Sequence, residues 1–134
     1  MSVKIKIFTM ASAVALSIGG VAVTASSAEA VGGCPSAKLC LYRSTEYRTL
    51  SFAAASTGAC FTLSDYGLSA PGNGIMSYVN NLPVKATIWN SQNLHDWYAD
   101  ATIRPGGYSS DTGSNFPFHE SYKICTGNAL PYSG

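Results

Sequence analysis

Short apolar and aromatic runs alternate with clusters of turn-forming residues from residue 31 to the end of the chain. No run keeps the 3.6-residue apolar spacing of an amphipathic helix over a useful length, and the runs are rich in residues that favour strands. Gly, Pro, Asn, Asp and Ser separate them, as tight turns require. The pattern predicts eight short strands in an all-β sandwich. They span residues 39–43, 49–52, 60–63, 77–80, 86–90, 97–99, 101–104 and 121–126.

The first thirty residues follow a different pattern. Lys4 and Lys6 precede an apolar stretch over residues 7–24, and Ala28-Glu29-Ala30 is the small-x-small pattern that signal peptidase cuts. The apolar stretch is short and rich in small polar residues, and no later stretch could span a bilayer. We predict a signal peptide over residues 1–30, cleavage after Ala30, and a secreted, extracellular single domain over residues 31–134 with no membrane anchor.

The two halves of this domain are similar. The tetrapeptide LYRS at 41–44 is echoed by IWNS at 88–91, and Ser77-Tyr78 is echoed by Ser121-Tyr122, each near the end of its half. Such self-similarity indicates a duplicated unit that cannot bury its apolar face alone. We predict two four-stranded units packed face to face, with Trp89 at the core position that Tyr42 occupies in the first half.

Four cysteines lie in the mature part, at positions 34, 40, 60 and 125. Outside the cytosol, an even number of cysteines in a short chain predicts disulfides. Two bridges are expected, and three pairings are possible from the sequence.

Charge excludes some partner classes. The domain carries six cationic and six acidic side chains and is therefore neutral. Binding to nucleic acid or to an anionic membrane surface depends on clustered Lys and Arg. We expect neither partner, and we expect a monomer.

A family resemblance refines the fold. The opening CPSAKLCLY at 34–42, directly behind the signal peptide, resembles that of the secreted metalloproteinase inhibitor family described from Streptomyces. The four-strand repeat resembles βγ-crystallin Greek keys, the fold of that family. The resemblance implies a βγ-crystallin-like double Greek-key sandwich. It also implies a Cys34–Cys40 bridge, which leaves Cys60 to pair with Cys125.

The same resemblance implies a function, namely inhibition of an extracellular thermolysin-type zinc protease by a rigid, substrate-like loop. That family holds its reactive bond in a tight second disulfide loop in the later half, whereas here no cysteine lies between Cys60 and Cys125. No reactive-site residue is therefore carried over. The residue we select as protease contact is Leu68, the apolar tip of the segment 64–74, which Pro71 stiffens. The alternative is that Leu68 packs into the core.

Calcium is a second candidate ligand, because many βγ-crystallins bind it in an Asn/Asp-rich loop. Asn73, Gly74 and Ser77 match that loop in part, but the second and last oxygen ligands are missing, and Pro117 and Phe118 replace donors in the second half. Calcium needs six to eight oxygen ligands. We expect no cofactor and at most millimolar calcium affinity, with Ser77 hydrogen-bonding the turn at Asn73-Gly74 instead.

Enzymatic chemistry has no sequence support. His95 and His119 lack metal-binding or triad spacing, and Asp96 and Asp100 are expected on the solvated face of a strand. We predict that the protein is not an enzyme.

Two alternatives to inhibition stay open, a secreted toxin or antimicrobial protein and a carbohydrate-binding or structural cell-surface module. A glycan platform would use Trp89, Trp97, Tyr98 and Tyr108 as coplanar exposed rings. An inhibitor would instead present a rigid convex loop with an apolar tip.

Overall fold

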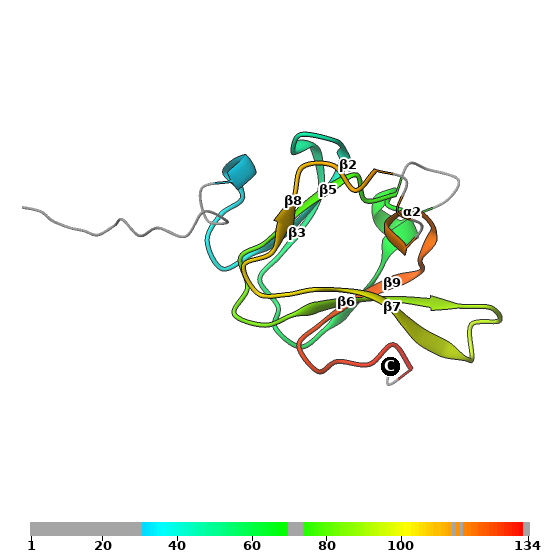
Figure 1. Cartoon of the computed structure of the whole chain (residues 1–134). Coiled ribbons are helices and arrows are strands. Elements are labelled where there is room, and N and C mark those ends of the chain that lie inside the picture. Colours follow the sequence, from blue (N-terminus) through cyan, green and yellow to red (C-terminus); the bar gives the residue numbers. More distant parts are fainter. Residues whose placement is uncertain (1–30, 70–73, 114, 116, 133–134) are drawn as a thin grey trace, which may run out of the picture.

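The computed structural model describes residues 31–69, 74–113, 115 and 117–132, and in this part of the chain it is an all-β sandwich of two four-stranded sheets (Figure 1). Both disulfides that the resemblance implied are present, Cys34–Cys40 and Cys60–Cys125. The prediction of a two-disulfide sandwich is confirmed. The strands are β2 (Leu39–Ser44), β3 (Arg48–Ala54), β4 (Cys60–Thr62), β5 (Ser77–Asn80), β6 (Ala86–Ser91), β7 (Trp97–Ile103), β8 (Tyr108–Ser109) and β9 (Lys123–Thr126).

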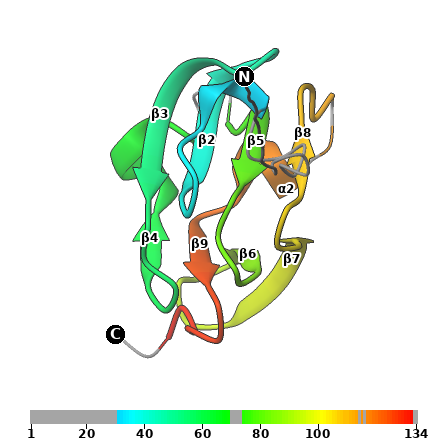
Figure 2. The same cartoon turned by 90° about the vertical axis from the view of Figure 1, so that its left-hand side faces the viewer.

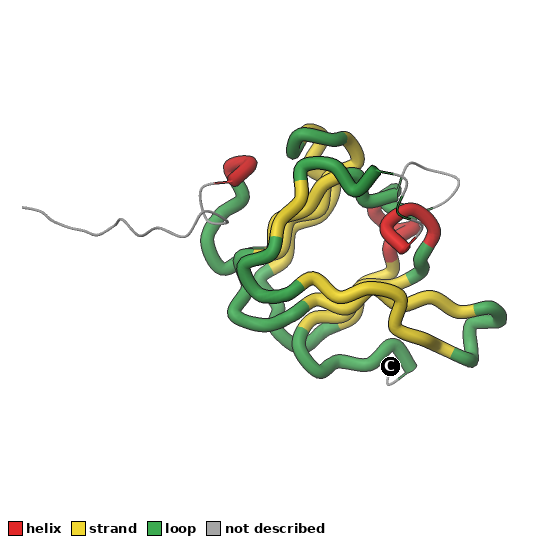
Figure 3. The backbone as a smooth tube through the Cα atoms, viewed as in Figure 1, coloured by secondary structure: helices red, strands yellow, loops and turns green. Residues whose placement is uncertain are grey.

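Strands β2, β3, β4 and β6 differ from the predicted ranges by one or two residues at one or both ends. The other differences concern β7, β8 and β9. The predicted strands 97–99 and 101–104 are one strand, β7, and β9 begins at Lys123 rather than at Ser121. Strand β8 was not predicted. Three short helical turns were also missed, η2 (Val31–Gly33), η3 (Leu63–Tyr66) and α2 (Pro117–Glu120), all drawn in red in Figure 3. Within the described residues, no helix is long and apolar enough to cross a membrane.

The sheet order is that of a double Greek key. The sheets run β3-β2-β5-β8 and β4-β9-β6-β7. In each half, the fourth strand lies beside the first and the first beside the second, while the third strand crosses to the sheet of the other half. Figure 2 shows this exchange, with β4 continuing below β3 on one side and β8 standing above β7 on the other. The two halves are therefore interlocked rather than merely stacked.

The pairing registers support the predicted duplication. Leu41 pairs with Phe52 and Tyr42 with Leu50, so one residue of β3 is extra at this point. In β6 and β7 the register shifts at the matching place, between Ile88 and Trp89. A β-bulge therefore recurs at the same point of both halves, and Trp89 occupies the position of Tyr42.

The later part of the predicted repeat is wrong by two residues. Tyr42 pairs with Ser77, whereas Trp89 pairs with Lys123. The structural equivalent of Ser77 is thus Lys123 and not Ser121. The two Ser-Tyr pairs resemble each other in sequence without occupying the same place in the fold.

Two apolar clusters hold the fold together. The main core lies between the sheets, and its residues alternate along the strands. A smaller cluster on the outer face of the first sheet joins Cys34, Cys40, Tyr42 and Val79, and the Tyr42 hydroxyl donates to the Gly32 carbonyl at 3.3 Å. The Cys34–Cys40 bridge therefore fastens the N-terminal segment across this sheet.

Candidate functional site

Leu68 does not form an exposed tip, and its selection as protease contact is wrong. Gly67 has a left-handed φ of 70°, and it turns the chain inward after η3. The Leu68 amide then donates to the Leu63 carbonyl at 3.0 Å, and the Leu68 side chain is 0% exposed in the main core. The core alternative holds instead. Pro71 lies outside the described residues.

Gly74 and Ser77, two of the residues selected as calcium ligands, take part in packing and hydrogen bonds within the fold. Gly74 has a φ of 76°, and a side chain there would meet the backbone of Phe118 and His119. Ser77 is buried, and its hydroxyl donates to the Ser44 carbonyl at 2.7 Å and accepts from the Tyr47 amide at 3.1 Å. Ser77 therefore secures the turn between β2 and β3. Asn73 lies outside the described residues.

Weak calcium binding stays a prediction. Among the residues that the structure describes, no three His, Cys, Asp or Glu side chains gather at one place. We expect millimolar calcium to leave the melting temperature unchanged, because Ser77 already uses its hydroxyl within the fold. Differential scanning calorimetry with calcium and with a chelator measures this. Micromolar affinity in a calorimetric titration would contradict it.

Two of the titratable side chains singled out in the sequence, His119 and Asp100, have partners that join separate segments of the fold. Nε2 of His119 lies 3.2 Å from the Thr112 hydroxyl, which donates to the Ile75 carbonyl. Asp100 is not on a solvated face as expected. It is the extra residue of the bulge in β7, and its carboxylate accepts from Ser121 Oγ at 3.0 Å and from Asn90 Nδ2 at 3.4 Å. These groups hold loops and strands to one another.

The four aromatic residues that a glycan platform would use are divided between different faces. Trp97 and Tyr98 are successive residues of β7 and so point to opposite faces, while Tyr108 belongs to the other sheet. Trp97 meets Tyr122 edge to face, at 87° and 6.3 Å. Trp89 is half-buried on its sheet. The four selected aromatic residues therefore do not form one flat surface.

The connection between β6 and β7 is the convex loop that the sequence analysis placed elsewhere. Figure 1 shows this hairpin extending beyond the body of the sandwich. Leu94 lies in the connecting loop, with a φ of 66° and 60% of its surface exposed. We call residues 91–96 the tip loop. It presents an isolated apolar side chain on a projecting turn.

Side chains of the tip loop bind its own backbone. Ser91 Oγ accepts from the Asn93 amide at 3.3 Å and from the Leu94 amide at 2.7 Å. Asn93 Oδ1 accepts from the amides of His95 at 2.9 Å and Asp96 at 2.8 Å. Asn93 Nδ2 also donates to the Asp96 carboxylate at 2.9 Å. Four successive amides are thus held by two side chains, so the loop is rigid without a disulfide.

The sequence contains the signal for this loop. Ser and Asn, two residues apart inside a turn, favour side-chain to backbone hydrogen bonds. The predicted strands 86–90 and 97–99 leave this segment only as the connection between them. Leu94 directly follows Asn93, so the Ser and Asn pattern also indicates which apolar side chain lies on the turn.

A scan with protein-family models finds no match to this chain, and a search of characterised proteins finds no significant relative. The functional conclusion therefore depends on geometry and on the resemblance of the opening motif.

Proposed function

We propose that this protein is a secreted inhibitor of extracellular thermolysin-type zinc proteases and that the tip loop is its contact. One observation carries the proposal, namely that Leu94 projects from a loop whose four amides are held by Ser91 and Asn93. The opening motif at 34–42 supports the protease class. Two disulfides fit an oxidising, extracellular compartment.

Rigidity is what a small inhibitor needs from such a loop. Fixing the backbone of one flexible residue costs about 1–2 kcal/mol, and a loop that is ordered only on binding loses this from its affinity. In the tip loop the backbone is already fixed when the protein folds, so this free-energy cost is not subtracted from the binding affinity. The hydrogen bonds of Ser91 and Asn93 therefore take the place of the second disulfide loop that the inhibitor family uses.

The backbone of Leu94 suggests a plug rather than a substrate. Proteases bind peptides in an extended conformation, which requires a negative φ, whereas Leu94 has a φ of 66°. In this proposal the Leu94 side chain fills the apolar pocket beside the zinc without placing a peptide bond for attack. The loop is then expected to stay uncut after long incubation with the protease.

Replacing Leu94 by Asp tests the contact. We expect inhibition of thermolysin to weaken by about 100-fold or more, because a charge replaces the apolar anchor of the interface. The melting temperature should not change, since the Leu94 side chain is mostly exposed. The matched control is Leu50→Asp, which introduces the same charge at a leucine 53% exposed on β3 and should leave inhibition intact.

Removing the amide acceptors tests the rigidity separately. The double variant Ser91→Ala, Asn93→Ala keeps Leu94 and should weaken inhibition about tenfold, because the loop must then be ordered on binding. If wild-type protein in micromolar excess leaves thermolysin fully active, inhibition of this protease class is refuted. The toxin and binding-module alternatives would then take precedence.

A further inference from the structure

The two edges where the sheets meet differ in how they are closed. At one edge β3 of the first sheet faces β4 of the second, and three aromatic rings fill the space. The Phe52 ring lies 4.8 Å from the Phe61 ring and 4.8 Å from the Tyr66 ring, centroid to centroid. Edge-to-face packing of this kind excludes water from the edge.

The duplicated edge lacks these aromatics. Phe52 pairs with Leu41 in the first half, and the equivalent pair in the second half is Ile88 with Ala101. Phe61 pairs with Ile124, and the equivalent pair across the other sheet is Tyr78 with Ser109. Ala and Ser thus stand where the first edge has two Phe rings. Near the edge between β7 and β8, the Tyr78 ring instead stacks on the Phe118 ring of α2, with the centroids 5.2 Å apart.

A cavity of about 500 Å³, open to solvent, lies at the edge between β7 and β8. Its volume is that of a small-molecule site. The residues that line it come from β5, from the end of β7, from β8 and from the turn between β7 and β8. They are Tyr78, Thr102, Ile103, Arg104, Gly107 and Tyr108.

The buried side chain of Asn80 holds the turn that forms one wall of the cavity. Asn80 is 0% exposed, and its Nδ2 donates to the carbonyls of Val84 at 3.0 Å, Ile103 at 3.2 Å and Arg104 at 3.2 Å. The Asn80 backbone amide donates to the Gly107 carbonyl at 2.8 Å. Gly107 is buried, and a Cβ there would come within 3.0 Å of the Arg104 carbonyl. The cavity is therefore preformed.

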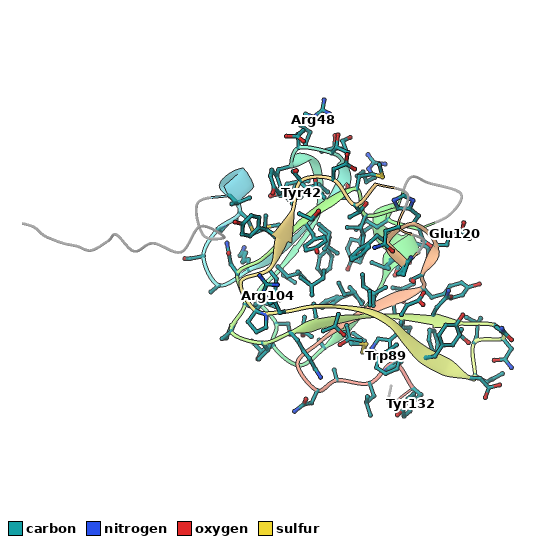
Figure 4. The ribbon with its side chains drawn as sticks, viewed as in Figure 1. Tyr42, Arg48, Trp89, Arg104, Glu120 and Tyr132 are labelled. Carbon is teal, nitrogen blue, oxygen red and sulfur yellow. A yellow bond between two sulfur atoms is a disulfide. The ribbon has the colours of Figure 1, made fainter. Side chains whose placement is uncertain are left out.

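The polar groups of the cavity favour a ligand with one negative charge and several hydroxyls. The lining residues include Arg104, which carries a guanidinium, Thr102, which carries a hydroxyl, and two tyrosines. Burial raises the pKa of Tyr78, and the positive charge of Arg104 partly offsets that rise. Figure 4 shows Arg104 at the connection between β7 and β8. A single guanidinium matches one carboxylate in a bidentate pair.

We propose that this cavity binds a uronic acid residue of an acidic glycan. The carboxylate pairs with Arg104, the sugar ring lies against the half-exposed ring of Tyr108, and the sugar hydroxyls meet Thr102 and the Tyr78 hydroxyl. Tyrosine combines an apolar ring with a polar tip, which suits a sugar face. The site is independent of the proposed protease contact.

The two sites can be occupied together. The tip loop precedes β7 and Arg104 follows it, and the seven residues of β7 separate them by about 20 Å. Figure 1 shows the hairpin end and the β7 to β8 connection on opposite sides of the molecule. Binding to a polysaccharide would hold the protein on a surface while the tip loop stays accessible.

An NMR titration of the wild-type protein with D-glucuronic acid tests this proposal without any protease. We expect shifts of the amide signals of residues 102–108, with a dissociation constant of about 1 mM for the single sugar. Arg104→Gln should weaken binding at least about tenfold. Tyr108→Ala should abolish the shifts, while Tyr108→Phe should keep them. The matched control is Arg48→Gln, which removes the same charge from an exposed arginine of β3 and should bind normally.

Three results would overturn the proposal. If D-glucose produces the same shifts, the negative charge of the ligand is irrelevant. If acetate produces the same shifts as D-glucuronic acid, the sugar ring is irrelevant. Unchanged amide signals at saturating D-glucuronic acid would mean that the cavity takes no such ligand. Inhibition of thermolysin is measured separately, so each proposal can fail without the other.

Discussion

Replacing both Cys60 and Cys125 by alanine is expected to lower the free energy of unfolding by about 4 kcal/mol, about twice the loss from removing Cys34 and Cys40. The two bridges differ in the chain that they close, since the cysteines are 65 residues apart in one and 6 in the other. A longer closed loop removes more conformations from the unfolded chain.

The position of the long bridge increases its importance. Cys60 belongs to β4, the third strand of the first half, and Cys125 to β9, the last strand of the second half. The ladder between these strands has only three residue pairs, one of which is the bridge itself. The disulfide therefore secures the strand exchange that interlocks the halves.

Urea denaturation of the two double variants, monitored by far-ultraviolet circular dichroism, measures the difference. A domain of this size has a total stability of about 5–15 kcal/mol, so the Cys60, Cys125 variant should be largely unfolded at modest urea. Equal losses in the two variants would show that loop length does not govern the effect.

The alternating pattern predicted most strands because their burial alternates within short segments. The strand β5 has the predicted boundaries, 77–80, and both hairpin strands of each half were placed within two residues except at β7. Asp100 explains that exception. A carboxylate in the middle of a strand resembles a break. Its hydrogen-bond partners are Asn90 of β6 and Ser121, which lies in the segment before β9.

Strand β8 could not be predicted because its two residues have no pattern of their own. Tyr108 and Ser109 form a strand only because Val79 and Tyr78 of β5 pair with them. The sequence around them, rich in Gly and Ser, indicates a loop. Tertiary pairing decides the structure here, and the local preference is too weak to oppose it.

The functional candidates depended even more on tertiary contacts. One loop leucine, Leu68, is buried and another, Leu94, is exposed, although both stand among polar residues in the sequence. The side-chain hydrogen bonds of the tip loop have a local signal in Ser91 and Asn93. The cavity at the edge between β7 and β8 has none, since its lining residues come from β5, from the end of β7, from β8 and from the turn between β7 and β8.

Both proposed sites lie where the two halves of the domain differ. The two halves keep the same strand order and the same bulge, so each feature has a counterpart in the other half. The aromatic rings of Phe52 and Phe61 pack at one edge, whereas Ala101 and Ser109 occupy the equivalent positions at the other. The loop between β2 and β3 is short, whereas the loop between β6 and β7 carries Leu94 outward. At both proposed sites, the residues of the second half differ from their counterparts in the first half while the strand order stays the same.

Replacing Leu68 by Ala is expected to lower the free energy of unfolding by about 2–5 kcal/mol, and Leu68→Asp is expected to prevent folding. The Leu68 side chain is 0% exposed in the main core, so truncation removes apolar contacts and leaves a cavity. An aspartate there would bury a charge without a partner.

Leu94→Ala provides the matched comparison, because it deletes the same atoms from a leucine that is 60% exposed. Its stability should stay within about 0.5 kcal/mol of the wild type. Urea denaturation with both disulfides intact measures the two variants side by side. A Leu68→Ala variant as stable as Leu94→Ala would show that Leu68 lies outside the core and would return it to consideration as a protease contact. A clear difference between them means that any loss of inhibition in Leu68 variants reflects unfolding, whereas a loss in Leu94 variants of normal stability reflects the interface.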